Sequence, residues 1–218
     1  MNNILVVPDE IKKHLSGDVF QALMQMPGTA FRDLSAMTEV SAIQKLSAIN
    51  ILTTPLVAYG QYGCNPATMQ SFVMTEDLGE IVTVEELCAN WSQYTASFKQ
   101  ALMQAVAECA CKLHSAGLVH RDFYLCHFVL KKQDLNCESL KIENLQLIDL
   151  HRMLQGQAIN GRTVMKDIAG LYFSALQCGL TTQDLDVFER HYLQQTADFW
   201  TKVESRAQIL LSKFNSQK

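Results

Sequence analysis

Residues 117–130 read G-L-V-H-R-D-F-Y-L-C-H-F-V-L, and residues 145–152 read L-Q-L-I-D-L-H-R. Gly117 is a residue type that commonly follows the last turn of a helix, and short apolar runs at 128–130 and 145–148 are typical of strands. The pattern therefore predicts a helix, a polar loop, two strands and a second polar loop, in that order. The predicted helix carries an apolar stripe at helical spacing: Leu102, Val106, Cys109 and Leu113.

The H-R-D triplet and the later I-D pair have the order expected of a phosphotransferase site. In kinases the Asp of H-R-D accepts the proton of the acceptor hydroxyl, and an Asp that follows a strand holds Mg²⁺. Asp122 is therefore the candidate catalytic base, with His120 and Arg121 completing the catalytic loop, and Asp149 is the candidate metal ligand. The alternative, a surface turn in which Arg121 pairs with Asp122, does not account for the distant I-D-L-H-R.

One position points to a particular family. Protein kinases place Asn five residues after the catalytic Asp, whereas this chain has His127 there. The stretches H-R-D-F-Y-L-C-H-F-V-L and I-D-L-H-R closely resemble the lipopolysaccharide core kinase family of the WaaP/InaA type, which phosphorylates heptose or Kdo of the inner core. The resemblance implies an α+β, protein-kinase-like fold of two lobes, with a small, truncated, β-containing N-lobe and a mainly helical C-lobe.

The histidines around the loop have several interpretations. His127 occupies a metal-ligand position, but imidazole is a poorer partner than oxygen for Mg²⁺. We favour a phosphate contact or a brace of the loop for His127, with metal binding as the alternative. His151 and Arg152 either position phosphate or lock the segment after Asp149. We interpret His114, on the preceding helix, as a packing residue outside the site.

The resemblance extends over about residues 10 to 195. Residues 71–78, S-F-V-M-T-E-D-L, look like the family's segment that enters the hinge between the lobes. This likeness implies that Glu76 to Leu78 offer backbone groups to adenine. Lys166-Asp167 with L-Y-F at 171–173 is similar to the family's K-D-x-x-x-L-Y-F-S helix, in which the Asp braces the catalytic loop.

A kinase also needs a Lys on a strand to hold the α- and β-phosphates and a Glu on the next helix to orient it. Glu39 shares a helical face with Ile43 and Leu46, which would turn its carboxylate inward. The resemblance of I-K-K-H at 11–14 to the family's F-[IL]-K-x-H segment selects Lys12, with Lys13 as the alternative. Both lysines, and Glu39, have the further alternative of a solvated surface side chain.

The phosphate-covering glycine hairpin of kinases has no counterpart ahead of Lys12. Eleven residues precede Lys12 and none is Gly, so residues 1–7 supply one strand at most. We therefore expect a single kinase-like domain over residues 1–218. In this domain residues 1–78 form a shortened N-lobe and hinge, and residues 79–218 form the C-lobe. A truncated start, a minimal kinase and a pseudokinase all remain open.

Composition limits the classes of partner. The chain has 218 residues, 48% of them hydrophobic, which suits one substantial core. It has no run of eighteen apolar residues and no signal peptide at its start, so we expect a cytoplasmic protein. A net charge of −4 without a basic stripe argues against nucleic-acid binding. Peripheral contact with the inner face of the cytoplasmic membrane is implied by the resemblance alone.

The sequence thus predicts a kinase that uses ATP and Mg²⁺ to phosphorylate a sugar hydroxyl of a lipid-linked saccharide, the lipopolysaccharide inner core. Positioning and charge neutralisation would supply most of the catalysis. Two other classes stay open: an inactive pseudokinase scaffold in envelope assembly, and a kinase for a protein or small-metabolite acceptor. Heptose and Kdo are not separable at this stage.

Overall fold

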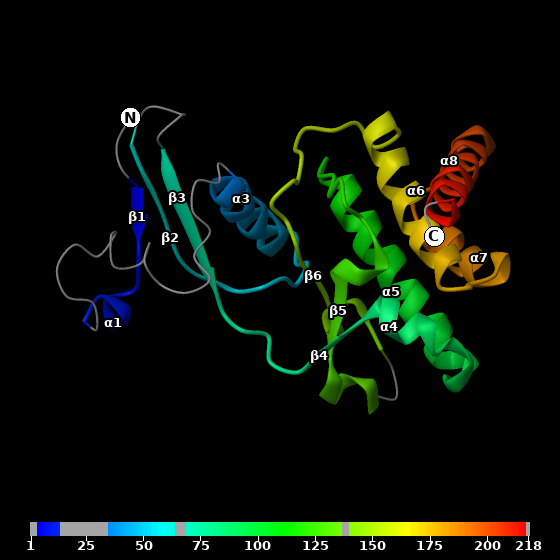
Figure 1. Ribbon diagram of the computed structural model, residues 1–218, viewed down its shortest axis with the longest axis horizontal. Helices are drawn as coiled ribbons and strands as arrows, with labels where there is room; N and C mark the ends of the chain where they lie inside the picture. Colours follow the sequence, from blue (N-terminus) through cyan, green and yellow to red (C-terminus); the bar gives the residue numbers. More distant parts are fainter. Residues whose placement is uncertain (1–3, 14–34, 64–68, 137–139, 217–218) are drawn as a thin grey trace.

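The computed structural model describes residues 4–13, 35–63, 69–136 and 140–216. Figure 1 shows a small sheet at one end of the molecule and a larger, mainly helical part at the other. Helix α3 (Ser35–Ala48) lies between them. The predicted α+β, two-lobed architecture is confirmed.

The smaller lobe is built on an antiparallel sheet in the order β1-β2-β3. Its strands are β1 (Ile4–Val6), β2 (Leu56–Tyr62) and β3 (Gln70–Thr75), and the one-turn helix α1 (Asp9–Lys12) follows β1. Val7, Ala58 and Phe72 form a small apolar cluster on it. Gly60 is required here, because a Cβ at this position would lie 2.6 Å from the Phe72 ring.

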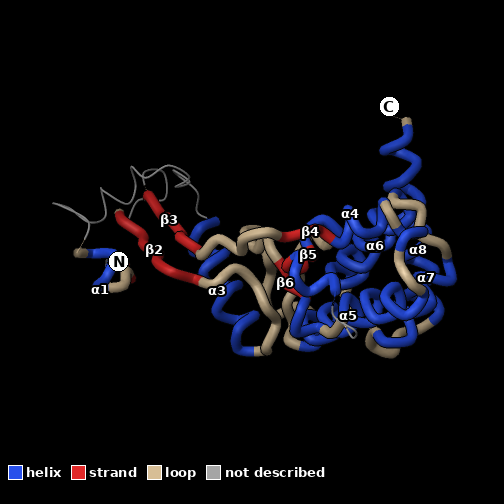
Figure 2. Tube along the Cα trace, turned by 90° about the horizontal axis from the view of Figure 1, so that it is seen from below, coloured by secondary structure: helices blue, strands red, loops and turns tan. Residues whose placement is uncertain are grey.

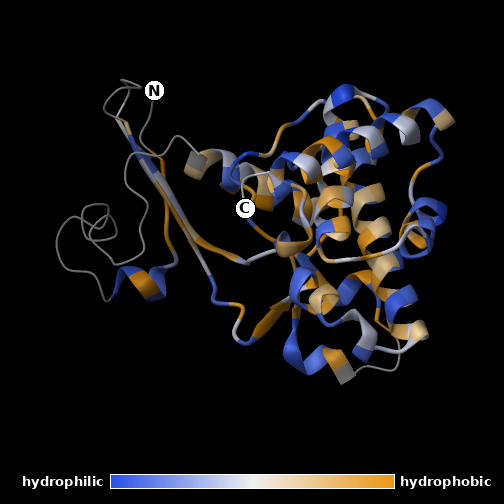
Figure 3. Cartoon of the chain, turned by 45° about the vertical axis from the view of Figure 1, so that its right-hand side comes forward, coloured by the Kyte–Doolittle hydropathy of each residue, from blue (hydrophilic) through white to orange (hydrophobic). Residues whose placement is uncertain are grey.

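The larger lobe combines a second antiparallel sheet with a helical bundle (Figure 2). The sheet has the order β4-β5-β6, and Figure 3 shows apolar residues concentrated where the helices of this lobe meet. The predicted stripe on α5 is fully buried. The elements are β4 (Ile81–Thr83), α4 (Val84–Ala89), α5 (Ala96–Ser115), β5 (Phe128–Lys131), β6 (Leu145–Leu147), α6 (Arg162–Gln177), α7 (Thr182–His191) and α8 (Ala197–Asn215).

The segment between β5 and β6 is not a plain loop, because its described residues include two short 3-10 helices, Lys132–Asn136 and Ile142–Asn144. Leu140 and Ile142 are buried and join the main core, so the insert is anchored by apolar contacts. Of the helices in the described part of the chain, none has the length and apolarity to cross a bilayer.

The two lobes are joined through α3 and the strand after it. Ala42, Ile43 and Leu46 on α3 belong to the core cluster of the larger lobe. The N–H of Leu147 on β6 donates to the carbonyl of Leu52 at 2.9 Å. This bond ties the segment before β2 to the strand that leads to Asp149.

Threonine caps define where several helices begin. Thr181 accepts from the N–H of Asp184, and the Asp184 carboxylate accepts from the N–H and hydroxyl of Thr181 in return. Asp184 Oδ1 also accepts from the indole N–H of Trp91 at 2.9 Å. Partial burial acts to raise the pKa of Asp184, but the Thr181 N–H and the Trp91 indole outweigh it and lower the pKa.

We predict that Asp184→Ala lowers the free energy of unfolding at neutral pH by about 1–2 kcal/mol, because a cap and a side-chain hydrogen bond are lost. Asp186→Ala, an exposed change on the same helix, is the control. Since the pKa of Asp184 is lowered by folding, its contribution is present above the unfolded pKa and disappears as pH falls through the folded pKa. Urea unfolding of the variants at pH 7 and in acid tests this. A difference that persists in acid would contradict it.

Candidate active site

The catalytic loop is held by one buried carboxylate on α6. Asp167 is 1% exposed and accepts hydrogen bonds from the backbone N–H of His120 at 2.7 Å and of Arg121 at 2.9 Å. Arg121 has φ +76°, a left-handed conformation that costs a non-glycine residue energy. The two bonds to Asp167 hold the loop in that conformation, as the resemblance of this helix implies.

Asp167 is itself held from the other side. His114 is fully buried, with Nε2 3.4 Å from Asp167 Oδ2 and Nδ1 2.7 Å from the hydroxyl of Tyr192. Both ring nitrogens of His114 are thus occupied, one by the Tyr192 hydroxyl and the other by the Asp167 carboxylate. His114 is therefore part of the support of the catalytic loop, which the interpretation as a packing residue missed. Its position on the helix, six residues before His120, is the signal that could have identified it.

Helix α6 approaches the loop closely at two small residues. A Cβ on Gly170 would lie 3.2 Å from the Tyr124 ring and 3.4 Å from the carbonyl of Phe123. Ser174 is buried, and its hydroxyl accepts from the N–H of Leu125 at 3.0 Å. Both residues lie within or beside the K-D-x-x-x-L-Y-F-S stretch, so the small side chains there are explained by contact with the catalytic loop.

His120 connects the catalytic loop to the strand before Asp149. Its Nε2–H donates to the carbonyl of Ile148 at 2.9 Å, while Nδ1 is buried and has no partner among the described residues. Burial lowers the pKa of His120, so the ring is neutral and the proton lies on Nε2. His120 thus sets the spacing between the two polar loops and does not reach outward as an acid or base.

His127 joins the two candidate aspartates directly. Its Nδ1 lies 2.6 Å from the carbonyl of Asp122, and its Nε2 lies 3.2 Å from Oδ2 of Asp149. A hydrogen bond with the Cys126 side chain, together with the Asp122 carbonyl, raises the pKa of His127 to about 9 against the effect of burial. The geometry matches a brace, one of the two roles favoured for this residue, and a phosphate contact of His127 stays a prediction. Asp149 has φ +64°, and its other oxygen contacts Nδ1 of His151.

Asp122 is paired with a cation from the second loop. Arg152 Nη1 donates to both carboxylate oxygens of Asp122, at 2.7 and 2.8 Å. Arg121, the partner in the surface-turn alternative, has an exposed side chain without a bond to Asp122 among the described residues. The alternative is therefore wrong, and the two distant stretches of sequence meet at one ion pair.

Not all candidate residues of the smaller lobe lie near the ion pair of Asp122 and Arg152. Lys12 ends helix α1 and pairs with Asp9 at 2.9 Å, so the expected position on a strand is wrong. Lys13 follows α1 and is also exposed. Figures 1 and 2 both show α1 at the outer end of the molecule, away from β5 and β6. Glu39 is half-buried on α3, on the face of the buried Ile43, as predicted.

Glu76 and Leu78 lie between β3 and β4, in the connection between the lobes. The N–H of Glu76 already donates to the carbonyl of Pro55 at 2.9 Å. The N–H of Gly79 donates to the Asp77 side chain. Their location agrees with a hinge, and adenine contact by Glu76 and Leu78 stays a prediction.

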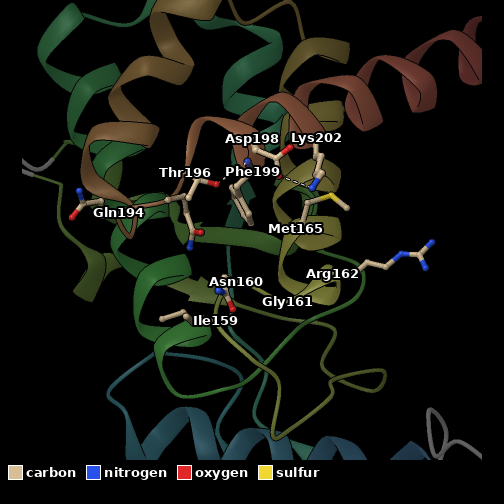
Figure 4. Close-up of a pocket in the computed structure, with 11 residues that line it drawn as sticks. Ile159, Asn160, Gly161, Arg162, Met165, Gln194, Thr196, Asp198, Phe199 and Lys202 are labelled. Atoms are coloured by element: carbon tan, nitrogen blue, oxygen red, sulfur yellow. Dashed lines mark hydrogen bonds and ion pairs between the residues drawn. The ribbon is translucent and has the colours of Figure 1, made fainter.

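A cavity of about 860 Å³ lies apart from these residues (Figure 4). It opens between residues 159–161, the start of α6 and the segment 194–202. None of the predicted site residues lines it. Figure 4 shows Asp198 paired with Lys202 there and Arg162 extending outward. The predicted site residues of the larger lobe thus lie on the loops that carry Asp122 and Asp149 and not at this cavity.

Comparison with known proteins agrees with this geometry. The model of the lipopolysaccharide kinase (Kdo/WaaP) family matches residues 11–192. The chain belongs to this family. It is 38% identical over 165 residues to the lipopolysaccharide core heptose(I) kinase WaaP of Pseudomonas aeruginosa, an alignment that covers 74% of this chain and 60% of that protein. It is also 38% identical over 162 residues to WaaP of Escherichia coli K12, covering 73% and 60%.

The chain thus spans about 60% of the length of the curated relatives it matches. Among solved structures it is similar to WaaP in complex with acyl carrier protein, with a TM-score of 0.78 and 31% sequence identity. That similarity covers 95% of this chain and 99% of the other. The family and the kinase-like fold inferred from the two quoted stretches are confirmed.

We predict that Asp167→Ala lowers the free energy of unfolding by about 2–4 kcal/mol, because two N–H groups of the catalytic loop lose their acceptor inside the protein. Asp198→Ala is the control, since it removes a carboxylate from an exposed pair worth at most about 1 kcal/mol. Urea denaturation followed by circular dichroism measures both. Equal, small losses for the two variants would show that Asp167 is not a support of the loop.

Proposed function

We propose that this chain is a kinase that transfers the γ-phosphoryl group of ATP to a sugar hydroxyl of the lipopolysaccharide inner core. The observation that supports the proposal most is the junction of Asp122 and Asp149 through His127. In a kinase the residue that receives the acceptor proton and the residue that holds the metal lie side by side. The junction occurs in a chain whose family contains lipopolysaccharide kinases.

In this proposal Asp122 orients the acceptor hydroxyl and receives its proton, with its direction set by the loop bonds to Asp167. His120 and Arg121 shape the loop through their backbone bonds. His127 acts as a brace and keeps Asp122 and Asp149 in register. Catalysis by such a site rests on positioning and on stabilisation of charge.

Asp149 is the proposed Mg²⁺ ligand. Mg²⁺ in a kinase is bound by one or two carboxylates together with phosphate oxygens, so a single protein carboxylate suits the proposal. When bound, the ion neutralises charge on the β- and γ-phosphates. The exposed Asp149 carboxylate offers oxygen ligands, and His127 does not need to coordinate the ion.

The smaller lobe would hold the rest of ATP. Glu76 and Leu78 are proposed to contact adenine through their remaining backbone groups, since they lie in the connection between lobes. Glu39 faces the apolar side of α3 and is proposed to orient a phosphate-binding cation. Lys12 is the weakest assignment, because it points its charge at Asp9 at the outer end of the lobe.

Heptose is the acceptor that the relatives favour, since the two compared proteins are named heptose(I) kinases. Kdo is the second candidate, because the family model bears its name. A lipid-linked acceptor and ATP would meet at the inner face of the cytoplasmic membrane, so we propose peripheral contact there. The solved relative is a complex with acyl carrier protein, and we propose this class of protein as a partner.

We predict that Asp122→Asn reduces phosphoryl transfer to core saccharide by at least about 100-fold, since general-base catalysis and orientation are lost. Binding of ATP with Mg²⁺ should change little. Transfer of labelled phosphate and isothermal calorimetry are the two measurements, with Asp186→Asn as a surface control. Unchanged transfer by the Asp122 variant would rule out its role, and a pseudokinase would bind ATP without any transfer.

We predict that Asp149→Ala removes the Mg²⁺ dependence of ATP binding, because the proposed oxygen ligand is gone. Calorimetric titration with ATP, in Mg²⁺ and in EDTA, measures this directly. Wild type should bind ATP more tightly with Mg²⁺, and the variant should bind equally under both conditions. A variant that keeps the Mg²⁺ effect would disprove the assignment of Asp149.

A further inference from the structure

The catalytic loop of this chain has no Lys or Arg beyond the H-R-D triplet. Residues 123–127 are Phe, Tyr, Leu, Cys and His, with no Lys or Arg among them. Phosphoryl transfer spreads negative charge over the three equatorial oxygens of the moving group, and sites of this kind place Lys, Arg or Mg²⁺ against that charge. A Lys or Arg at this place, beside the imidazole of His127, has to come from another segment of the chain.

Arg152 reaches that place from the segment after Asp149. The backbone is fixed two residues after Arg152, where the N–H of Leu154 donates to the carbonyl of Val119 at 2.8 Å and the N–H of Val119 donates to the carbonyl of Leu154 at 3.0 Å. The N–H of Met153 closes a turn on the carbonyl of Leu150 at 3.1 Å. Arg152 is thereby held over Asp122.

The guanidinium of Arg152 retains unused donors. Only Nη1 contacts Asp122, and no contact of Nε or Nη2 occurs within the described ranges. The Arg152 side chain is 45% exposed, whereas the Asp122 side chain is 18% exposed. A guanidinium has five N–H donors in a fixed plane and does not lose its proton in proteins. Arg152 can therefore hold Asp122 and an external oxyanion at once.

We infer that Arg152 is a further catalytic residue, which bridges the Asp122 carboxylate and the γ-phosphoryl oxygens during transfer. The inference rests on the proposed function. In the transfer the bond between the γ-phosphorus and the bridging oxygen of ADP breaks and a bond from the acceptor oxygen forms. The acceptor proton passes to Asp122. Arg152 keeps its proton and supplies charge and hydrogen bonds to the oxygens in motion.

The test compares binding of ADP with binding of ADP and aluminium fluoride, a mimic of the transferring phosphoryl group, both with Mg²⁺. We expect Arg152→Gln to bind ADP within about threefold of wild type. Its affinity for the aluminium fluoride complex should fall by about 100-fold or more, the loss typical of one removed oxyanion donor. Arg190→Gln, an exposed position on α7, is the matched control and should behave as wild type.

A second comparison separates direct action from an effect through Asp122. In the Asp122→Asn background, a residue that only positions Asp122 has nothing left to position, so Arg152→Gln would cost nothing further. A direct contact with the phosphoryl group predicts that Arg152→Gln still weakens aluminium fluoride binding in this background. Loss of that additional effect would overturn the inference.

The outcomes also separate this inference from the proposed function. If wild type and Arg152→Gln bind ADP with aluminium fluoride equally well, the role of Arg152 is overturned and the kinase proposal still stands. If Arg152→Gln weakens binding of the aluminium fluoride complex but not of ADP, and wild type does not phosphorylate core sugars, the inference is supported and the proposed acceptor is wrong. Wild type that binds no nucleotide overturns both.

Discussion

The structure depends on one buried carboxylate, that of Asp167. A charged group inside a protein is costly unless it is hydrogen-bonded, and Asp167 is bonded to the catalytic loop on one side and to His114 on the other. Three helices therefore meet at this group: α5 through His114, α6 through Asp167 itself and the end of α7 through Tyr192. The helical bundle and the loop that it carries are a single hydrogen-bonded unit.

The same unit explains how two strained residues are tolerated. Arg121 and Asp149 both adopt left-handed backbone conformations, each at a cost of about 1–3 kcal/mol. Arg121 is held by Asp167, and Asp149 follows Ile148, whose N–H donates to the carbonyl of His127 at 3.0 Å. The bonds around each residue hold its backbone in this conformation. The strain is local to the residues that carry the proposed chemistry.

Sequence was sufficient for the larger lobe and insufficient for the smaller one, for physical reasons. The α5 stripe and the strands on either side of the insert follow from apolar periodicity, and the family follows from the two quoted stretches. Arg152 and Asp122 are thirty residues apart and pair through a tertiary contact, which the apolar periodicity of the sequence cannot predict. Lys12 was selected because residues 11–14 resemble a short segment of the family, which implied a strand. In the structure Lys12 lies instead in a one-turn helix and pairs with Asp9.

The distribution of apolar contacts has a consequence for motion. Helix α3 contributes to the main core, whereas the sheet β1-β2-β3 has a separate cluster of three buried residues, Val7, Ala58 and Phe72. Regions with few buried apolar contacts open at lower free energy than the core of a protein. We therefore expect the sheet to open at a lower free energy than the main core, although Leu56 and Val73 tie it to that core, and Glu39 on α3 then keeps its position relative to the larger lobe.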